Sequence, residues 1–296
     1  MLWMGVSLIV ASYVYRSYRK SKSFSFVVIS DVQYSDKPCQ QVLVIRWVGQ
    51  QRSLTCLVHL GDLVDGSATE QQTRKEYSQV CAAFDDCKVP VLHVVGNHCL
   101  DVSRDVLKEL FPSTRFYYRW EPHDDWCFLF LDCLEISCKG AINEHYQQEA
   151  QHYLETQQQQ PRATRWNGAI SSTQLEWLEN ELQHCQRKVI VMGHIPLVEE
   201  ASDAAHLVWN AEQVLDILHR YHHLVIAYFA GHYHRGGYAV DAYGLHHVTF
   251  PAICDAPAHQ NAWAKIRCEP HRIVIQGYGT VPSQTWTWSP CKISTQ

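Results

Sequence analysis

The 296-residue sequence lacks several features that would each define a class of protein. It has 12 cysteines but no Cys-x-x-Cys pair, so the spacing typical of structural zinc sites is missing. Beyond the first residues, no apolar run approaches the ~20 residues needed to span a bilayer. The net charge is -5 and the body of the chain has no basic stripe, which argues against a nucleic acid polymer as a partner.

The cysteines are spread from Cys39 to Cys291 without a pairing pattern. Cys56, Cys127 and Cys133 lie in apolar, strand-like runs, where cysteine behaves as a small buried hydrophobe. We therefore expect free thiols and a cytoplasmic protein. A secreted, disulfide-bonded form is the alternative, because an even number of cysteines can pair.

Residues 1–23 form an extension of a different character. Its first 15 residues are mostly apolar, and four basic residues follow between positions 16 and 22. The apolar part is shorter than a membrane span, and the charges lie on the wrong side for a cleaved signal peptide. We expect an extension without a function of its own. The alternatives are a targeting segment or an anchor over residues 1–22, and only an anchor would bring the protein to a membrane.

From residue 24 onward, apolar runs alternate with helical patterns. Five runs rich in Val, Ile and Leu predict buried strands at residues 24–30, 55–60, 89–95, 188–192 and 224–230. The spacing of apolar residues predicts helices at 69–84, 172–184 and 207–221. The last part of the chain is typical of a meander, with strands at 238–241, 246–250, 262–268 and 272–276.

This alternation predicts an α/β protein with two packed β-sheets flanked by helices, in a single domain over residues 24–290. The region 100–187 is longer than a crossover needs and contains the Gln-rich stretch 157–160. We expect that stretch to be a surface loop and the region to include a cap-like insertion over the site. The side chains to examine there are Trp120, Trp126, Trp166 and Asn167.

Five short motifs occur in order, each where an apolar run gives way to a loop. They are Asp31-Val-Gln33, Gly61-Asp62-Leu-Val-Asp65, Gly96-Asn97-His98, Gly193-His194 and Gly231-His232-Tyr-His234. Each motif alone is ordinary turn chemistry, but the ordered set at strand ends, where open α/β sheets bind ligands, indicates a site. Carboxylate, amide and imidazole groups without thiolates suit divalent cations, and two such ions are the usual equipment for attacking a phosphate ester.

The order and content of these motifs resemble the calcineurin-like metallophosphoesterases, whose fold is a four-layer αββα sandwich of mixed sheets. The resemblance implies that Asp62 bridges two ions. It also implies the remaining ligands, which are Asp31, Gln33 and His234 for the first ion and Asn97, His194 and His232 for the second. His98 would face the substrate and donate a hydrogen bond or a proton. Asp65 would hold a histidine in one tautomer, with a plain turn residue as the alternative.

Two positions depart from the usual pattern of that family. Most members have histidine where this chain has Gln33, and an acid where it has Cys99. An amide oxygen is a weaker and harder ligand than imidazole, which favours Mn²⁺, with Fe, Mg²⁺ and Zn²⁺ as alternatives. Cys99 is expected to replace a contact behind the ligands, which would leave the orientation of His98 less secure.

Longer strings resemble one subgroup, the manganese-dependent ADP-ribose/CDP-alcohol diphosphatases, from about residue 24 to residue 282. They are residues 31–34, 59–66, 167–171, 174–178, 209–219, 231–238 and 244–247. The resemblance implies hydrolysis of the phosphoanhydride in ADP-ribose or CDP-choline, which would release AMP or CMP. The substrates would be small nucleoside diphosphate conjugates. The alternatives are a cyclic-nucleotide phosphodiesterase, a phosphomonoesterase or a non-catalytic scaffold on the same fold.

Substrate contacts are the least explicit part of the sequence. A diphosphatase needs an apolar or aromatic platform for the base. The resemblance places segments around the pocket that contain Tyr34, Asn167, Tyr238, His246 and His247. Each of these residues could equally serve packing.

Overall fold

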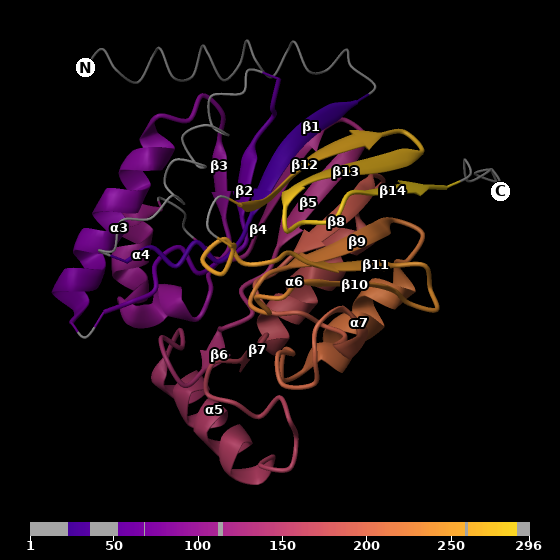
Figure 1. Ribbon diagram of the computed structural model, residues 1–296. Coiled ribbons are helices and arrows are strands. Elements are labelled where there is room, and N and C mark those ends of the chain that lie inside the picture. The colour runs from indigo at the N-terminus through magenta and orange to yellow at the C-terminus, as the bar shows by residue number, and fades with distance from the viewer. Residues whose placement is uncertain (1–22, 36–52, 68, 112–114, 258–259, 289–296) are drawn as a thin grey trace, which may run out of the picture.

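The computed structural model describes residues 23–35, 53–67, 69–111, 115–257 and 260–288. Two six-stranded sheets form its centre (Figure 1). The first has the order β14-β13-β12-β1-β2-β3, with β1 at Phe24–Ile29, β2 at Leu57–His59, β3 at Val91–His93, β12 at Ala262–Glu269, β13 at Arg272–Gly279 and β14 at Gln284–Thr287. The second has the order β10-β11-β9-β8-β5-β4, with β4 at Tyr118–His123, β5 at Trp126–Phe130, β8 at Lys188–Met192, β9 at Val225–Ala230, β10 at Gly237–Val240 and β11 at His246–Thr249.

Both sheets are mixed. In the first sheet β1, β2 and β3 are parallel, and β12 to β14 are antiparallel. In the second sheet β5, β8, β9 and β11 are parallel, and β4 and β10 form antiparallel edges. The two-sheet α/β prediction is therefore confirmed. The central strands are almost wholly buried, as expected for parallel strands covered on both faces.

Aromatic side chains fill the space between the sheets. Phe26 of β1 packs on Phe128 of β5 with ring centroids 4.8 Å apart, and Phe229 of β9 meets Trp286 of β14 at 6.4 Å. Trp126 was a candidate for the cap-like insertion. It is instead 1% exposed and belongs to this core. Since aromatic rings bury large apolar areas, these contacts hold the two sheets in fixed relative positions.

Helices cover the outer sides of the sheets. Helices α3 (Glu70–Asp85) and α4 (Arg104–Leu110) lie beside β2 and β3, and α6 (Ser172–Gln183) and α7 (Ala211–Arg220) lie beside the second sheet (Figure 1). Thr69 and Ser171 cap α3 and α6, because the side-chain oxygen of each accepts a bond from a main-chain N–H. Helix α7 begins later than residue 207, because Trp209 N–H bonds to Gly168 O and holds the preceding residues in a loop.

The region 100–187 divides into two parts. Strands β4 and β5 and helices α4 and α6 belong to the main body. The apolar patterns did not predict β4 or α4, and β5 was indicated only by the strand-like run around Cys127. Only β6 (Ile136–Ser137), α5 (Glu144–Thr156) and β7 (Gly168–Ala169) project from it, with their own small apolar cluster (Figure 1). The segment that projects is therefore shorter than the region in which the cap-like insertion was expected.

Other expectations can be compared with the described residues. Each cysteine there is a free thiol, and most are buried. No helix of the described ranges is long and apolar enough to cross a bilayer. The predicted extension, up to residue 22, lies outside the described residues.

Candidate metal centre

The five motifs meet at one edge of the molecule. Each follows the carboxyl end of a parallel strand, namely β1, β2, β3, β8 or β9, and these ends lie on the same side of the two sheets. Main-chain bonds join the loops directly: Asp31 N–H donates to Gly61 O at 3.1 Å, and Gly231 N–H donates to His194 O at 2.9 Å. The strand topology therefore brings together residues that are about 200 positions apart in the chain, such as Asp31 and His232.

The backbone at this edge is strained. Four non-glycine residues of the described chain have a left-handed φ, and they are Asp31 (49°), Gln33 (43°), Asp62 (54°) and His232 (66°). All four are predicted metal ligands. This conformation costs roughly 1–3 kcal/mol for each residue and clusters at functional sites. The strain therefore marks the same residues that the motifs do.

Two glycines allow the ligands to approach one another. Gly61 has a φ of +104°, and a Cβ at this position would overlap the ring of His194. A Cβ at Gly96 would overlap the carboxylate of Asp62. The Gly-Asp and Gly-Asn pairs of the motifs are thus required by close packing around the site and not only by turn geometry.

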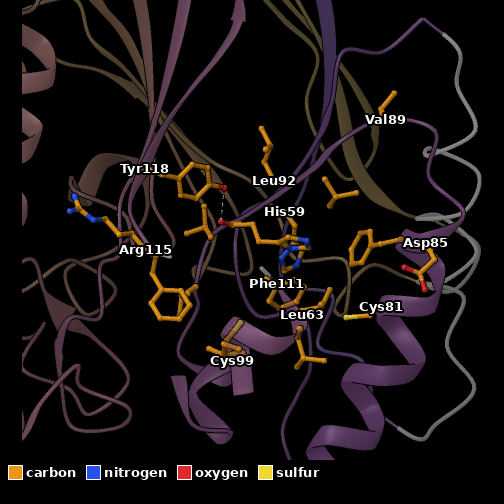
Figure 2. A pocket seen from close by; sticks show the side chains of 18 residues that line it. His59, Leu63, Cys81, Asp85, Val89, Leu92, Cys99, Phe111, Arg115 and Tyr118 are labelled. Atoms are coloured by element: carbon orange, nitrogen blue, oxygen red, sulfur yellow. Dashed lines mark hydrogen bonds between the residues drawn. The ribbon is translucent and has the colours of Figure 1, made fainter. Parts of the chain in front are cut away.

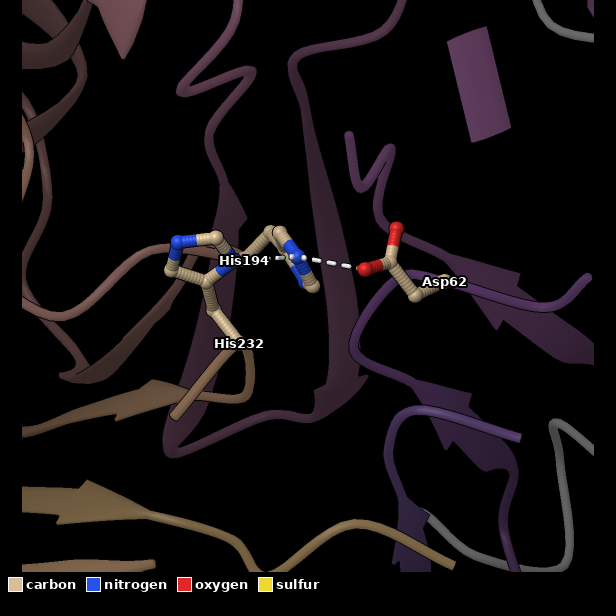
Figure 3. A group of neighbouring side chains, drawn as sticks. All are labelled: Asp62, His194 and His232. Atoms are coloured by element: carbon tan, nitrogen blue, oxygen red, sulfur yellow. Dashed lines mark hydrogen bonds and ion pairs between the residues drawn. The ribbon is translucent and has the colours of Figure 1, made fainter. Parts of the chain in front are cut away.

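A buried ligand set consists of Asp62, Asn97, His194 and His232. His194 Nε2 lies 3.2 Å from Asp62 Oδ2 and 3.2 Å from His232 Nδ1 (Figure 3). It also lies 3.1 Å from Asn97 Oδ1. Asp62, His194 and His232 are all buried and place ligand atoms within 4.8 Å of one another. Donor atoms of this kind, converging without an apolar side chain between them, form a suitable shell for a divalent cation.

The hydrogen bonds of His194 leave one nitrogen for a ligand role. Its Nδ1 donates to Leu60 O at 2.8 Å, so Nε2 is the atom that faces the other three side chains. Burial lowers the pKa of His194, but the carboxylate of Asp62 and that of Asp31 outweigh it and raise the pKa to about 9. Burial would also raise the pKa of Asp62, but the charge of His194 and its hydrogen bond hold it well below the usual range.

A cation fits this environment. Burial raises the pKa of Asp31, the charge of His194 opposes this shift, and the repulsion of Asp62 adds to it. Two buried carboxylates side by side repel, and positive charge placed between them relieves the repulsion. The site therefore has a surplus of negative potential that a divalent ion would neutralise.

An outer ligand set lies next to the buried one and consists of Gln33 and His234, with Cys254 and Asp255 behind them. His234 Nδ1 lies 2.8 Å from Asp255 Oδ2, which leaves Nε2 3.8 Å from Asp31 Oδ1 and 3.1 Å from Gln33 Nε2. The thiol of Cys254 donates to Gln33 Oε1 at 3.3 Å. Asp31 is fully buried and contacts both sets, because its carboxylate also accepts the main-chain N–H of His232.

His98 lines the cavity in front of these ligands. Its main-chain N–H donates to Asp62 Oδ1 at 2.8 Å, and its Nδ1 donates to the main-chain oxygen of Asp65 at 2.6 Å. The carboxylate of Asp65 is farther away, at 3.8 Å. The tautomer of His98 is thus set by a main-chain carbonyl, which corrects the prediction that the side chain of Asp65 does this. Cys99 is buried and points away from the cavity, and its main-chain oxygen accepts a bond from Tyr77.

The cavity at the metal centre has a volume of about 560 Å³. Trp166, which the sequence indicated, lies on its wall together with residues that the motifs did not mark: Asp203, His206, Tyr233, Arg235 and Asp255. His206 Nδ1 lies 2.7 Å from Asp203 Oδ1, on the loop between β8 and α7. The sequence offered only weak signals for these cavity residues. Arg235 merely follows the His-x-His pair, and no motif surrounds Asp203 and His206.

The structure does not place the five predicted substrate contacts at this cavity. None of Tyr34, Asn167, Tyr238, His246 and His247 lines this cavity. His246 and His247 begin β11, which runs parallel to β9, so they lie at the opposite end of the sheet from His232. Tyr238 bonds to His246, and His247 bonds to Asp241. Tyr34 packs against the core, and Asn167 is buried behind His232.

A second cavity, of about 510 Å³, lies between α3, α4 and the β3 edge (Figure 2). Its lining is mainly apolar, with His59 and His93 as the imidazoles, and it contains none of the predicted ligands. Trp120 is not part of a cap either, because it packs on Phe128 from strand β4. The polar 560 Å³ cavity is therefore the site where the chemistry is assembled.

A two-sheet sandwich with paired ligand sets at the carboxyl ends of its strands has the architecture of a metal-dependent phosphohydrolase. The family model for calcineurin-like phosphoesterases matches residues 24–236, and the chain belongs to this family. The whole ligand pattern Asp, Gln, Asp, Asn, His, His-x-His lies inside the matched region.

Individual relatives extend the comparison. The chain is 30% identical over 312 residues to the manganese-dependent ADP-ribose/CDP-alcohol diphosphatase of Bos taurus, which covers 88% of this chain and 92% of that protein. It is 30% identical to the protein of the same name from Oryza sativa subsp. japonica, over 86% of this chain and 91% of that one. The crystal structure of a dimetal phosphatase from Danio rerio superposes with a TM-score of 0.80 and 28% identity, over 90% of this chain and 99% of that one.

Proposed function

We propose that this protein hydrolyses the phosphoanhydride of small nucleoside diphosphate conjugates such as ADP-ribose and CDP-alcohols. The products would be AMP or CMP and a phosphorylated sugar or alcohol. The observation that carries the proposal is a complete ligand set that includes Gln33, in a chain 30% identical over 88% of its length to a protein named for these substrates. A pure scaffold would have no need of strained ligands held this closely.

The cavity walls support a substrate with two halves. His98, Asn97 and Trp166 line the metal cavity and also an adjoining cavity of about 330 Å³. Arg235 lies on the first wall, and Lys139 and Arg165 lie on the second. Basic side chains on both sides of the metals suit the two phosphates of an anhydride, and Trp166 offers a surface for a base or sugar.

The roles of the residues follow from their hydrogen bonds. Two bound ions would polarise a phosphoryl oxygen and activate water for in-line attack. His98 donates its Nδ1 proton to Asp65 O, which leaves Nε2 for the substrate. Only the doubly protonated ring has a proton at Nε2, so His98 would act as the imidazolium when it donates a hydrogen bond or a proton to the leaving oxygen. Asp62 would help to hold the metal: one of its oxygens faces His194, and the other accepts the main-chain N–H of His98. That it serves both ions is what the resemblance implies.

We propose Mn²⁺ as the metal. Asn97 adds an amide oxygen to the carboxylate and imidazoles of the buried set, which has no thiolate among its ligands. Gln33 turns Nε2 toward His234 and Oε1 toward Cys254, so its amide would have to turn over to offer a second oxygen to a metal. Oxygen-rich sites favour Mn²⁺ over softer ions. The name of the relatives agrees with this choice.

The test is product analysis. The purified protein, freed of metal and supplied with Mn²⁺, is incubated with equal concentrations of ADP-ribose, CDP-choline, cyclic AMP and p-nitrophenyl phosphate, and the products are separated by chromatography. We expect nucleoside monophosphate from the first two and slow turnover of the others. Faster turnover of cyclic AMP or p-nitrophenyl phosphate would replace this function with a phosphodiesterase or phosphomonoesterase activity, and no turnover of any compound would favour a scaffold.

A further inference from the structure

Asn167 is a fully buried side chain with every hydrogen-bonding group occupied. Its Nδ2 donates to Arg162 O at 2.9 Å and to Ala205 O at 2.7 Å. Both neighbours are main-chain carbonyls that can only accept, so the amide cannot be turned around without losing both bonds. The side-chain oxygen therefore has one defined direction, toward His232.

That direction decides the protonation of His232. Asn167 Oδ1 lies 2.8 Å from His232 Nε2, and because an oxygen of this kind only accepts, Nε2 must carry the proton. Nδ1 is then the nitrogen with a free lone pair, and it is the one that faces His194 Nε2 at 3.2 Å. Burial, with repulsion from His194, lowers the pKa of His232 well below its usual value, which agrees with a neutral ring.

The other histidine of the His-x-His pair is arranged in the opposite way. His234 uses Nδ1 for the carboxylate of Asp255 and turns Nε2 toward Asp31. Two neighbouring ligands thus use different ring nitrogens, because different groups lie behind them.

We propose that Asn167 is a positioning residue that fixes His232 as an Nδ1 ligand and links it to the cavity walls. Arg162 and Ala205 belong to the two loops that carry Trp166 and His206, so one amide joins both walls to a ligand. Any effect of Asn167 on substrate turnover rests on the proposed function. Its effects on the tautomer of His232 and on metal affinity do not depend on that function.

The first measurement needs no change at Asn167 and no added metal. Long-range ¹H–¹⁵N spectra of the metal-free protein report which nitrogen of each neutral histidine is protonated, and the signals of His232 are those lost in His232→Gln. We expect Nε2 to carry the proton. A proton on Nδ1 would overturn the inference, whether or not the variants described next can be purified.

Variants then separate positioning from packing. Asn167→Leu removes the acceptor at similar volume, whereas Asn167→Asp keeps an acceptor but loses both donors. The matched control is Asn210→Leu, because Asn210 makes paired bonds to Ile170 in the same segment without touching a ligand. Each variant is compared in the His232 spectrum and by Mn²⁺ titration calorimetry.

We expect mixed tautomers in Asn167→Leu and a loss of roughly 10–100-fold in the affinity of one Mn²⁺. Asn167→Asp should retain the Nε2–H form, and Asn210→Leu should retain both the tautomer and the affinity. An unchanged tautomer in Asn167→Leu, or an equal loss of affinity in the control, would assign a purely structural role to Asn167. A correct tautomer in a protein inactive on ADP-ribose would reject the proposed function and leave this inference standing.

Discussion

The buried and outer ligand sets differ in how they are held. His194 and Asp62 of the buried set are at most 1% exposed, and main-chain groups of Leu60 and His98 fix their positions. His234 of the outer set is 29% exposed, and the Asp255 behind it is 64% exposed. Water screens the outer charges but not the buried ones. One ion should therefore be bound tightly by a pre-formed site, and the other weakly by a site that solvent reaches.

Asp62 is the residue that both sets should share. Replacing it with alanine removes the bridging carboxylate, so we expect Asp62→Ala to lose both ions and at least ~10³-fold in kcat. Metal content after gel filtration and kcat with ADP-ribose would be measured. Asp125→Ala, at an exposed position outside the site, serves as the control. Retention of one full equivalent of metal would contradict the bridging role.

His98 tests whether chemistry can be separated from either set. We expect His98→Ala to keep both ions yet lose ~10²-fold in kcat, because a general acid or phosphate donor contributes about this much. Asp65→Asn is the companion variant: its main-chain oxygen still holds the ring, so kcat should stay within about twofold. If His98→Ala loses an ion, His98 is a ligand.

Proton competition should distinguish the buried set. Without metal, His194 keeps its proton up to a pKa of about 9, whereas His232 is neutral well below pH 6.5. Binding of the buried ion must therefore displace one proton. We expect its Mn²⁺ affinity to rise about tenfold for each pH unit between 6.5 and 8.5 and to level off near 9. Calorimetry in buffers of different ionisation enthalpy would count the proton.

The same shift changes the stability of the metal-free protein. The folded pKa of His194 lies above the unfolded value, so its contribution to the free energy of unfolding is complete below pH 6.5 and is lost as the pH rises toward 9. If the affinity of the tightly bound ion does not vary with pH, then metal binding does not remove the proton from His194.

The outer set should respond least. Asp255→Ala removes the carboxylate behind His234, and we expect a loss of ~10-fold in the affinity of the weaker ion alone. Asp203→Ala is the matched control, because it removes a carboxylate behind His206, which is not a predicted ligand. Equal losses in the two variants, or a loss at the tighter ion, would remove the distinction between the sets.

The sequence predicted much of the fold and most of the centre. Val- and Ile-rich runs identified β1, β2, β8 and β9, because strands buried on both faces must be apolar throughout. It did not identify β4, whose residues are only half buried and carry Arg119 and Glu121, so that no alternation is visible. It also began α7 too early, because the apolar Leu207 and Val208 pack in a loop rather than a helix.

What the sequence alone determined is the set of ligand types and their order, since a residue's donor atoms are part of its covalent structure. Tertiary structure decided which nitrogen of each histidine is free, through Leu60, Asn167 and Asp255, which belong to other segments of the chain. It also moved His246 and His247 to the far end of the sheet. Hydrogen-bond partners and strand direction depend on contacts distant in sequence, and no local pattern records them.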